Sequence, residues 1–154
     1  MALTYNNILV AVDGSQEAEW AFKKSIDIAK RNNARLILAH VVDNRTFAAV
    51  EAYSISISES AEQYAKDLLA EYKTAALDAG VRDVAADISF GSPKVKIPKD
   101  IAKQYDVDLI VCGATGLNAV ERFFIGSVSE HILRYAKCDV MVIRSDEKGP
   151  TEKA

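Results

Sequence analysis

Two short glycine-containing segments carry the residue types in this sequence that could hold a phosphate group. The first runs from Gly113 to Gly116 and the second, after nine intervening residues, from Gly126 to Ser129. Glycines let the backbone turn sharply and approach a bulky anion closely. The second segment opens a stretch with helical spacing, and the first N–H groups of a helix are unpaired and partially positive. Since Ser127 and Ser129 would add two hydroxyl donors, we predict a phosphate site here.

A carboxylate forms the third candidate feature, in the turn Asp13-Gly14-Ser15. Asp13 and Gly113 each lie at the end of a short apolar run of the kind that forms a buried strand. In an open α/β sheet, ligands bind beyond the carboxyl ends of the strands. An aspartate at that edge can accept hydrogen bonds from ribose hydroxyls, so phosphate and sugar could be bound on opposite sides of one crevice.

Each of these residues also has a purely structural interpretation. Gly126 and Ser127 fit a loop-to-helix turn in which Ser127 is the N-cap, and Asp13 fits a helix cap or a solvated carboxylate. Two glycines at this spacing are by themselves weak evidence for a phosphate site. Their combination with Asp13 at a neighbouring strand end is the stronger indication.

The elements that must position these residues follow from the hydrophobic pattern, in which short β-rich runs alternate with helical stretches. We expect Ser15 and Ser92 as helix N-caps, Gly80 as a helix stop and an irregular helix around Pro98. The expected strands are 8–12, 35–42, 84–90, 108–112 and 140–144, and the expected helices are 15–33, 60–79, 94–104 and 126–136. Parallel crossovers of this kind give a parallel α/β sheet with helices on both faces.

Two segments do not fit a strand or a helix. Residues 43–58 read as a polar connection, long enough to be a lid or a partner-facing loop. The charged tail 145–154 is expected to be frayed. We find no internal repeat or linker, so residues 1–154 are expected to form one domain.

Composition excludes several classes of function. With 19 basic and 22 acidic residues, the net charge of −3 argues against a nucleic-acid binder. The sequence shows neither a signal peptide nor an apolar run long enough to span a membrane, which predicts a cytoplasmic protein. Cys112 and Cys138 read as buried, reduced thiols, and neither His40 nor His131 has a partner at zinc-site spacing.

The spacing Gly-x-x-Gly, nine residues, Gly-Ser resembles the signature of ATP-binding universal stress proteins. Three sequence segments are also similar to that family and occur in the same order as in its members: ILVAVDGS at 8–15, LAHVV at 38–42 and GSVSEHILRYAKCDVMVIR at 126–144. The resemblance covers roughly residues 5 to 145 and implies a Rossmann-like sheet of the adenine nucleotide alpha hydrolase type, with strand order 3-2-1-4-5.

The resemblance further implies ATP as the ligand, with or without Mg²⁺, and assigns parts of the site. Adenine would lie beside Ala11, Val12 and Val41, and ribose on Asp13. Phosphates would lie against the glycines and the helix start. The full set implied is Ala11, Val12, Asp13, Val41, Cys112, Gly113, Thr115, Gly116, Gly126, Ser127, Val128 and Ser129. A homodimer through Val140–Ile143 is implied as well, and an apolar edge strand usually needs a partner.

One position departs from the family pattern: Thr115 stands where many nucleotide-binding members carry a basic residue. Arg122 could compensate, or it could be a solvated surface charge. The leading hypothesis is a nucleotide-dependent regulatory module of the stress response that acts on a protein partner. One alternative is a slow ATPase or nucleotide-dependent enzyme on the same scaffold. Because neither a Walker lysine nor another nucleotide-enzyme motif is present, we predict no catalytic residue and at most weak hydrolysis by bound water and a metal ion. An interaction module without nucleotide is the other alternative.

Overall fold

A computed structural model describes residues 4–43, 51–114 and 125–144, without the side chains of 51–58. Five parallel strands form one sheet in the order β3-β2-β1-β4-β5. This confirms the predicted fold class and strand order. The strands are β1 Asn7–Ala11, β2 Arg35–Val42, β3 Val84–Phe90, β4 Leu109–Gly113 and β5 Asp139–Ile143. Each lies within one residue of its predicted bounds.

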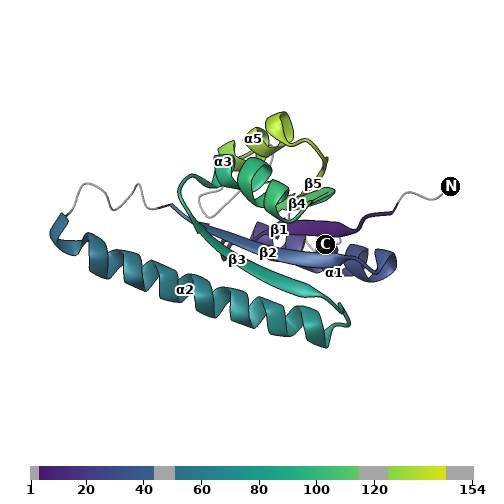
Figure 1. Ribbon diagram of the computed structural model, residues 1–154, viewed down its shortest axis with the longest axis horizontal. Coiled ribbons are helices and arrows are strands. Elements are labelled where there is room, and N and C mark those ends of the chain that lie inside the picture. Colours follow the sequence, from purple (N-terminus) through teal and green to yellow (C-terminus); the bar gives the residue numbers. More distant parts are fainter. Residues whose placement is uncertain (1–3, 44–50, 115–124, 145–154) are drawn as a thin grey trace, which may run out of the picture.

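Helices cover both faces of the sheet, as parallel crossovers require. Side chains of α1 (Gln16–Asn32) and α2 (Glu51–Asp78) pack on one face. The opposite face is covered by α5 (Ser127–Tyr135) and by a continuous helical segment made of α3 (Pro93–Val95), η2 (Lys96–Ile101) and α4 (Ala102–Gln104). Figure 1 shows α2 on one side of the strands and α3 and α5 on the other.

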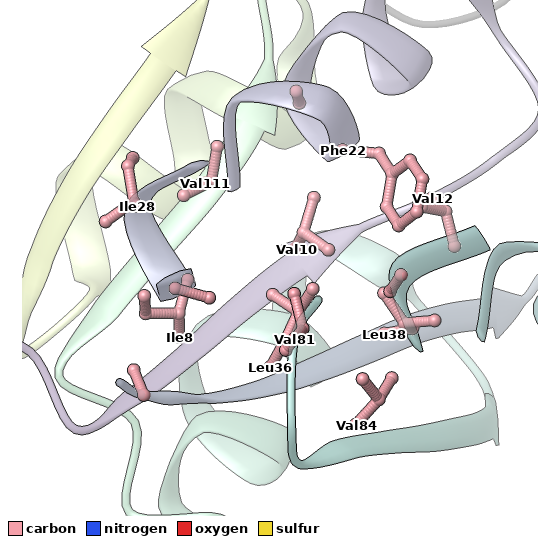
Figure 2. Close-up of a cluster of buried hydrophobic side chains, with 14 of the residues drawn as sticks. Ile8, Val10, Val12, Phe22, Ile28, Leu36, Leu38, Val81, Val84 and Val111 are labelled. Carbon is pink, nitrogen blue, oxygen red and sulfur yellow. The ribbon is translucent and has the colours of Figure 1, made fainter. Parts of the chain in front are cut away.

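The central strand β1 is buried on both sides, which explains its continuous apolar run. Ile8 and Val10 point into the cluster shown in Figure 2, together with Phe22 of α1 and Leu36 of β2. Leu9 points into the second cluster, beneath η2 and α5. Because β1 lies between β2 and β4, its carboxyl end is next to the carboxyl ends of both.

The predicted connection 43–58 is wrong over its second half, because α2 begins at Glu51 rather than at residue 60. The alternation Ser-Ile-Ser-Ile at 54–57 has no helical period, so the pattern gave no sign of a helix there. Once a helix is nucleated, each added residue gains a backbone hydrogen bond, and α2 propagates through this stretch. Residues 44–50 and the tail 145–154 lie outside the described residues.

The irregular helix expected around Pro98 is confirmed, and its irregularity is a π-helical segment. Proline has no N–H to donate and its ring clashes with the preceding turn. The Ala102 N–H donates to the carbonyl of Ile97, five residues earlier, which accommodates the proline inside a continuous helix. The helix stop at Gly80 is also confirmed, since this glycine follows α2 with φ +111°. Among the described residues, no helix has both the length and the apolar character to cross a membrane.

Candidate functional site

The turn that follows β1 is held by a series of hydrogen bonds. One residue past the strand, the Val12 N–H donates to the Ala39 carbonyl of β2 at 2.9 Å. An Asp13 carboxylate oxygen accepts from the Ser15 N–H at 2.9 Å, and the Ser15 hydroxyl accepts from the Ala18 N–H at 3.1 Å. Ser15 is therefore the N-cap of α1, as predicted. Asp13 stabilises the turn, and because a carboxylate has about four acceptor positions it can also accept from a ligand.

Two aromatic residues contact this turn, and the sequence interpretation missed both roles. The Nδ1 atom of His40, on β2, lies 2.8 Å from the Val12 carbonyl oxygen. The ring of Tyr64, on α2, meets the His40 ring edge-on with centroids 6.2 Å apart. The Tyr64 hydroxyl also occupies the space that a side chain on Gly14 would need. A signal existed, because His40 is the one polar residue in the apolar run 36–42.

The end of β4 is joined to α5 through Ser129. Its hydroxyl donates to the carbonyl oxygen of Gly113, and its side chain is buried at 5% exposure. This hydroxyl, predicted as a phosphate donor, is therefore already bonded within the protein. The neighbouring Cys112 is 3% exposed, and this burial raises the pKa of its thiol to about 11, against a smaller lowering by its hydrogen bond with Ser129. Cys112 is a neutral thiol at physiological pH.

Helix α5 begins beside this strand end without a side-chain cap in the part of the chain that is described. Gly126 is the N-cap residue, with φ −65° and ψ 159°. The alternative that made Ser127 the N-cap is wrong. The Gly126 N–H donates to the Ala114 carbonyl at 2.8 Å, which sets the helix start against the end of β4. The first-turn N–H groups have no partner inside the helix, so this end can bind an anion.

The apolar residues predicted around the base divide between the two faces of the sheet. Ala11, Val41, Cys112 and Val128 pack in the cluster that also contains residues of η2, α4 and α5. Val12 packs in the opposite cluster, shown in Figure 2, and is 2% exposed. The structure therefore brings the side chains of Ala11, Val41, Cys112 and Val128 together. The Val12 side chain lies on the opposite face of the sheet, so only its main chain can contribute to the site.

Three residues named in the sequence analysis, Thr115, Gly116 and Arg122, lie outside the described residues. The hydrogen bond from Gly126 to Ala114 nevertheless brings the two ends of their segment together. Among the residues that are described, no group of three histidine, cysteine or carboxylate side chains could hold a metal ion. Both cysteines are free thiols; the predicted burial is confirmed for Cys112 and is wrong for Cys138, which is only partly buried.

The comparisons with known proteins agree with this arrangement. A sequence model of the Universal stress protein family matches residues 4–144. The chain belongs to the universal stress protein family. A relative from Staphylococcus saprophyticus, named for the same family, is 53% identical over 145 residues, which are 94% of this chain and 87% of the relative. The resemblance seen in the sequence is thereby confirmed.

Solved universal stress proteins also share the fold. The structure of UspA from Lactobacillus plantarum is similar with a TM-score of 0.85 and 35% identity, over 93% of this chain and all of that one (100%). A universal stress protein crystallised in complex with cAMP has a TM-score of 0.69 and 25% identity, over 94% of this chain and 100% of its own. The second protein binds an adenine nucleotide.

Proposed function

We propose that this universal stress protein binds ATP at the carboxyl edge of its sheet, between β1 and β4, and acts as a nucleotide-dependent regulatory module in the stress response. The observation that carries the proposal is the start of α5, which has no side-chain cap in the described structure and lies against the end of β4. The cAMP complex of a similar protein supports an adenine nucleotide as the ligand class.

In this proposal the phosphates lie at the α5 N-terminus, where main-chain N–H groups and the exposed Ser127 hydroxyl donate to them. Gly116 and Thr115 complete the phosphate side. Ribose hydroxyls donate to Asp13 across the sheet edge. The base lies against the partly buried Ala11 and Val128, which belong to the same cluster as the buried Val41 and Cys112, and Val12 contributes its main chain.

Charge balance gives Mg²⁺ a role in the proposed complex. A helix N-terminus is worth roughly half an elementary charge, far less than a triphosphate carries. With Thr115 in place of a basic residue, a bound Mg²⁺ would neutralise much of the difference. We therefore expect ATP to bind more tightly with Mg²⁺ than with a chelator present. The free thiols agree with a reducing, cytoplasmic location for the protein and its regulated partner.

The first test is to denature the purified protein and identify any released nucleotide by mass spectrometry. Released ATP supports a stable sensor, whereas ADP or AMP would favour turnover. Calorimetric titration with ATP and Mg²⁺ then gives the affinity. A protein that releases no nucleotide and shows no heat of binding would contradict the proposal.

The second test places a side chain at the phosphate position. Gly126 has a φ of −65°, which any residue can adopt, so Gly126→Val should fold and lose most of its ATP affinity. Leu133→Val is the matched control, because Leu133 is an exposed residue farther along the same helix. Equal ATP affinity in the two variants would remove α5 from the site.

A further inference from the structure

The imidazole of His40 contacts the main-chain carbonyl of Val12, immediately before Asp13. We propose that His40 is a positioning residue for the ribose-binding carboxylate of Asp13, acting through the main-chain carbonyl of Val12. The proposal rests on the nucleotide site proposed above, and it adds a residue from β2 that lies outside the glycine signature.

The first step of the argument is the position of Val12, at the point where the sheet ladder ends. β1 pairs with β2 up to Ala11, which lies opposite Ala39. At Val12 the N–H donates to the Ala39 carbonyl at 2.9 Å, and the carbonyl oxygen lies 2.8 Å from His40 Nδ1. Both polar main-chain groups of Val12 are therefore bonded to adjacent residues of β2.

The second step is the protonation of the imidazole. A carbonyl oxygen can only accept, so the proton lies on Nδ1 and the ring donates. Neutral and protonated histidine both carry a proton on Nδ1 in this arrangement. The proposed role of His40 is therefore mechanical, since it depends on the proton that Nδ1 donates to the Val12 carbonyl.

The third step connects this bond to the carboxylate. The Val12 carbonyl, the Asp13 N–H and the Asp13 Cα atom belong to one planar peptide unit. Fixing the carbonyl therefore also fixes the position of the Asp13 Cα atom. On the other side, an Asp13 carboxylate oxygen accepts from the Ser15 N–H at 2.9 Å. Hydrogen bonds thus hold both the main chain on the N-terminal side of Asp13 and the Asp13 side chain. A ligand-binding group held in its bound geometry has less conformational freedom to lose on binding.

Tyr64 extends this arrangement to α2. Its ring meets the His40 ring edge-on, and its hydroxyl lies over Gly14. The Asp13 turn is therefore contacted from β2 by His40 and from α2 by Tyr64. A simpler interpretation is that His40 only fills space between β2 and α2, in which case its loss would affect stability but not the recognition of ribose.

The experiment separates these interpretations by comparing ATP with 2′,3′-dideoxy-ATP, which lacks both ribose hydroxyls. Affinities for the two ligands are measured calorimetrically, with Mg²⁺, in the wild type and in Asp13→Ala, His40→Phe and His40→Asn. Phenylalanine keeps a ring but removes the donor, whereas the asparagine amide nitrogen can take the place of Nδ1. His131→Phe is the matched control, because His131 also packs against a tyrosine, Tyr135, with ring centroids 4.4 Å apart.

We expect His40→Phe to bind ATP roughly fivefold more weakly, in line with the loss of one hydrogen bond, and to bind the dideoxy nucleotide as the wild type does. His40→Asn should recover most of the loss, and His131→Phe should match the wild type. His40→Phe combined with Asp13→Ala should be no weaker than Asp13→Ala alone, because both changes remove the same ribose interaction.

An unchanged preference for ATP in His40→Phe would overturn the proposal, as would equal losses for the two ligands. Equal losses would point to a general packing role for His40. The Asp13→Ala protein distinguishes failure of this inference from failure of the proposed site. If Asp13→Ala loses the preference for ribose hydroxyls and His40→Phe keeps it, only the role of His40 is wrong. If the wild type shows no preference, the ribose site itself is wrong.

Discussion

Gly113, the last residue of β4, lies directly against Glu17 in the first turn of α1. A Cβ atom placed on Gly113 would be 2.8 Å from the Glu17 Cβ, 2.9 Å from its carbonyl carbon and 3.0 Å from its carbonyl oxygen. Two of these three atoms belong to the helix backbone, which cannot rotate away as a side chain can. The glycine is therefore required by the packing of α1 on β4, whether or not a phosphate approaches it.

We expect Gly113→Ala to destabilise the protein by about 1–3 kcal/mol, because α1 or β4 must shift to admit the methyl group. Urea denaturation measures the change in the free energy of unfolding. Ser127→Ala, an exposed change at the start of α5, is the control and should stay within about 0.5 kcal/mol of the wild type. A Gly113→Ala protein as stable as the wild type would show that the contact with Glu17 relaxes easily.

Ser15 and Ser92 each precede a helix, but replacing them with alanine should change the stability of the protein differently. The Ser15 hydroxyl accepts from the Ala18 N–H at 3.1 Å, so Ser15→Ala should cost about 1 kcal/mol. In the described structure the Ser92 hydroxyl is buried, caps nothing and has no hydrogen-bond partner. Because a buried unpaired hydroxyl is itself unfavourable, Ser92→Ala should be neutral or stabilising by up to about 1 kcal/mol. Thermal or urea denaturation of both variants measures the changes in stability. Equal losses of stability in the two variants would disprove the distinction.

These serines also show how far sequence reasoning reaches. Both positions were predicted as helix starts from residue type and neighbours, and both helices begin there. Whether a hydroxyl actually caps depends on its rotamer and on the surrounding packing, which local sequence does not specify. The strands were predictable for a stronger reason, since a strand buried on both faces must be apolar throughout, as Ile8, Leu9 and Val10 are.

The candidate site was predictable only where a local motif marks it. The Asp13 turn and the start of α5 were found from glycine and serine positions. The bond from His40 to Val12 joins residues 28 positions apart in different strands, and it depends on the register between β1 and β2. The bond from Ser129 to Gly113 likewise depends on how α5 packs against β4. Tertiary geometry determines both, so a pattern along the chain cannot supply them.

The buried thiol of Cys112 predicts how stability depends on pH. Burial raises the pKa of Cys112 from 9.0 to about 11 in the native state. Between these values the unfolded chain releases this proton and the native protein keeps it, so rising pH favours unfolding. This loss of stability is negligible below about pH 8 and grows to roughly 1 kcal/mol near pH 10.

We therefore expect the wild type to lose more stability than Cys112→Ala when the pH is raised from about 8 to about 10. Denaturant titrations at the two pH values give the difference, which does not depend on the cavity that the substitution itself creates. Cys138, whose pKa burial also raises, is present in both proteins and cancels. Parallel losses in the two proteins would mean that the Cys112 thiol is not protected from ionisation.

The remaining prediction concerns β5, which is an edge strand of the described sheet and ends in the apolar run 140–143. We propose that two copies of the chain pair along β5, because the open main-chain groups of an apolar edge strand favour pairing with another strand. Val142→Lys should then shift the protein from dimer to monomer in sedimentation velocity, because it adds charge to a partly buried residue of the paired strand.

Phe90→Lys is the matched control, because Phe90 ends β3 on the opposite edge and is also partly exposed at 38%. It adds the same charge at an edge that the proposal leaves unpaired, so this protein should sediment as the wild type does. Because Val142 also packs against the core cluster beneath α5, circular dichroism must show that the Val142→Lys monomer is folded. A folded Val142→Lys dimer would place the interface elsewhere, and dissociation by Phe90→Lys alone would assign it to β3.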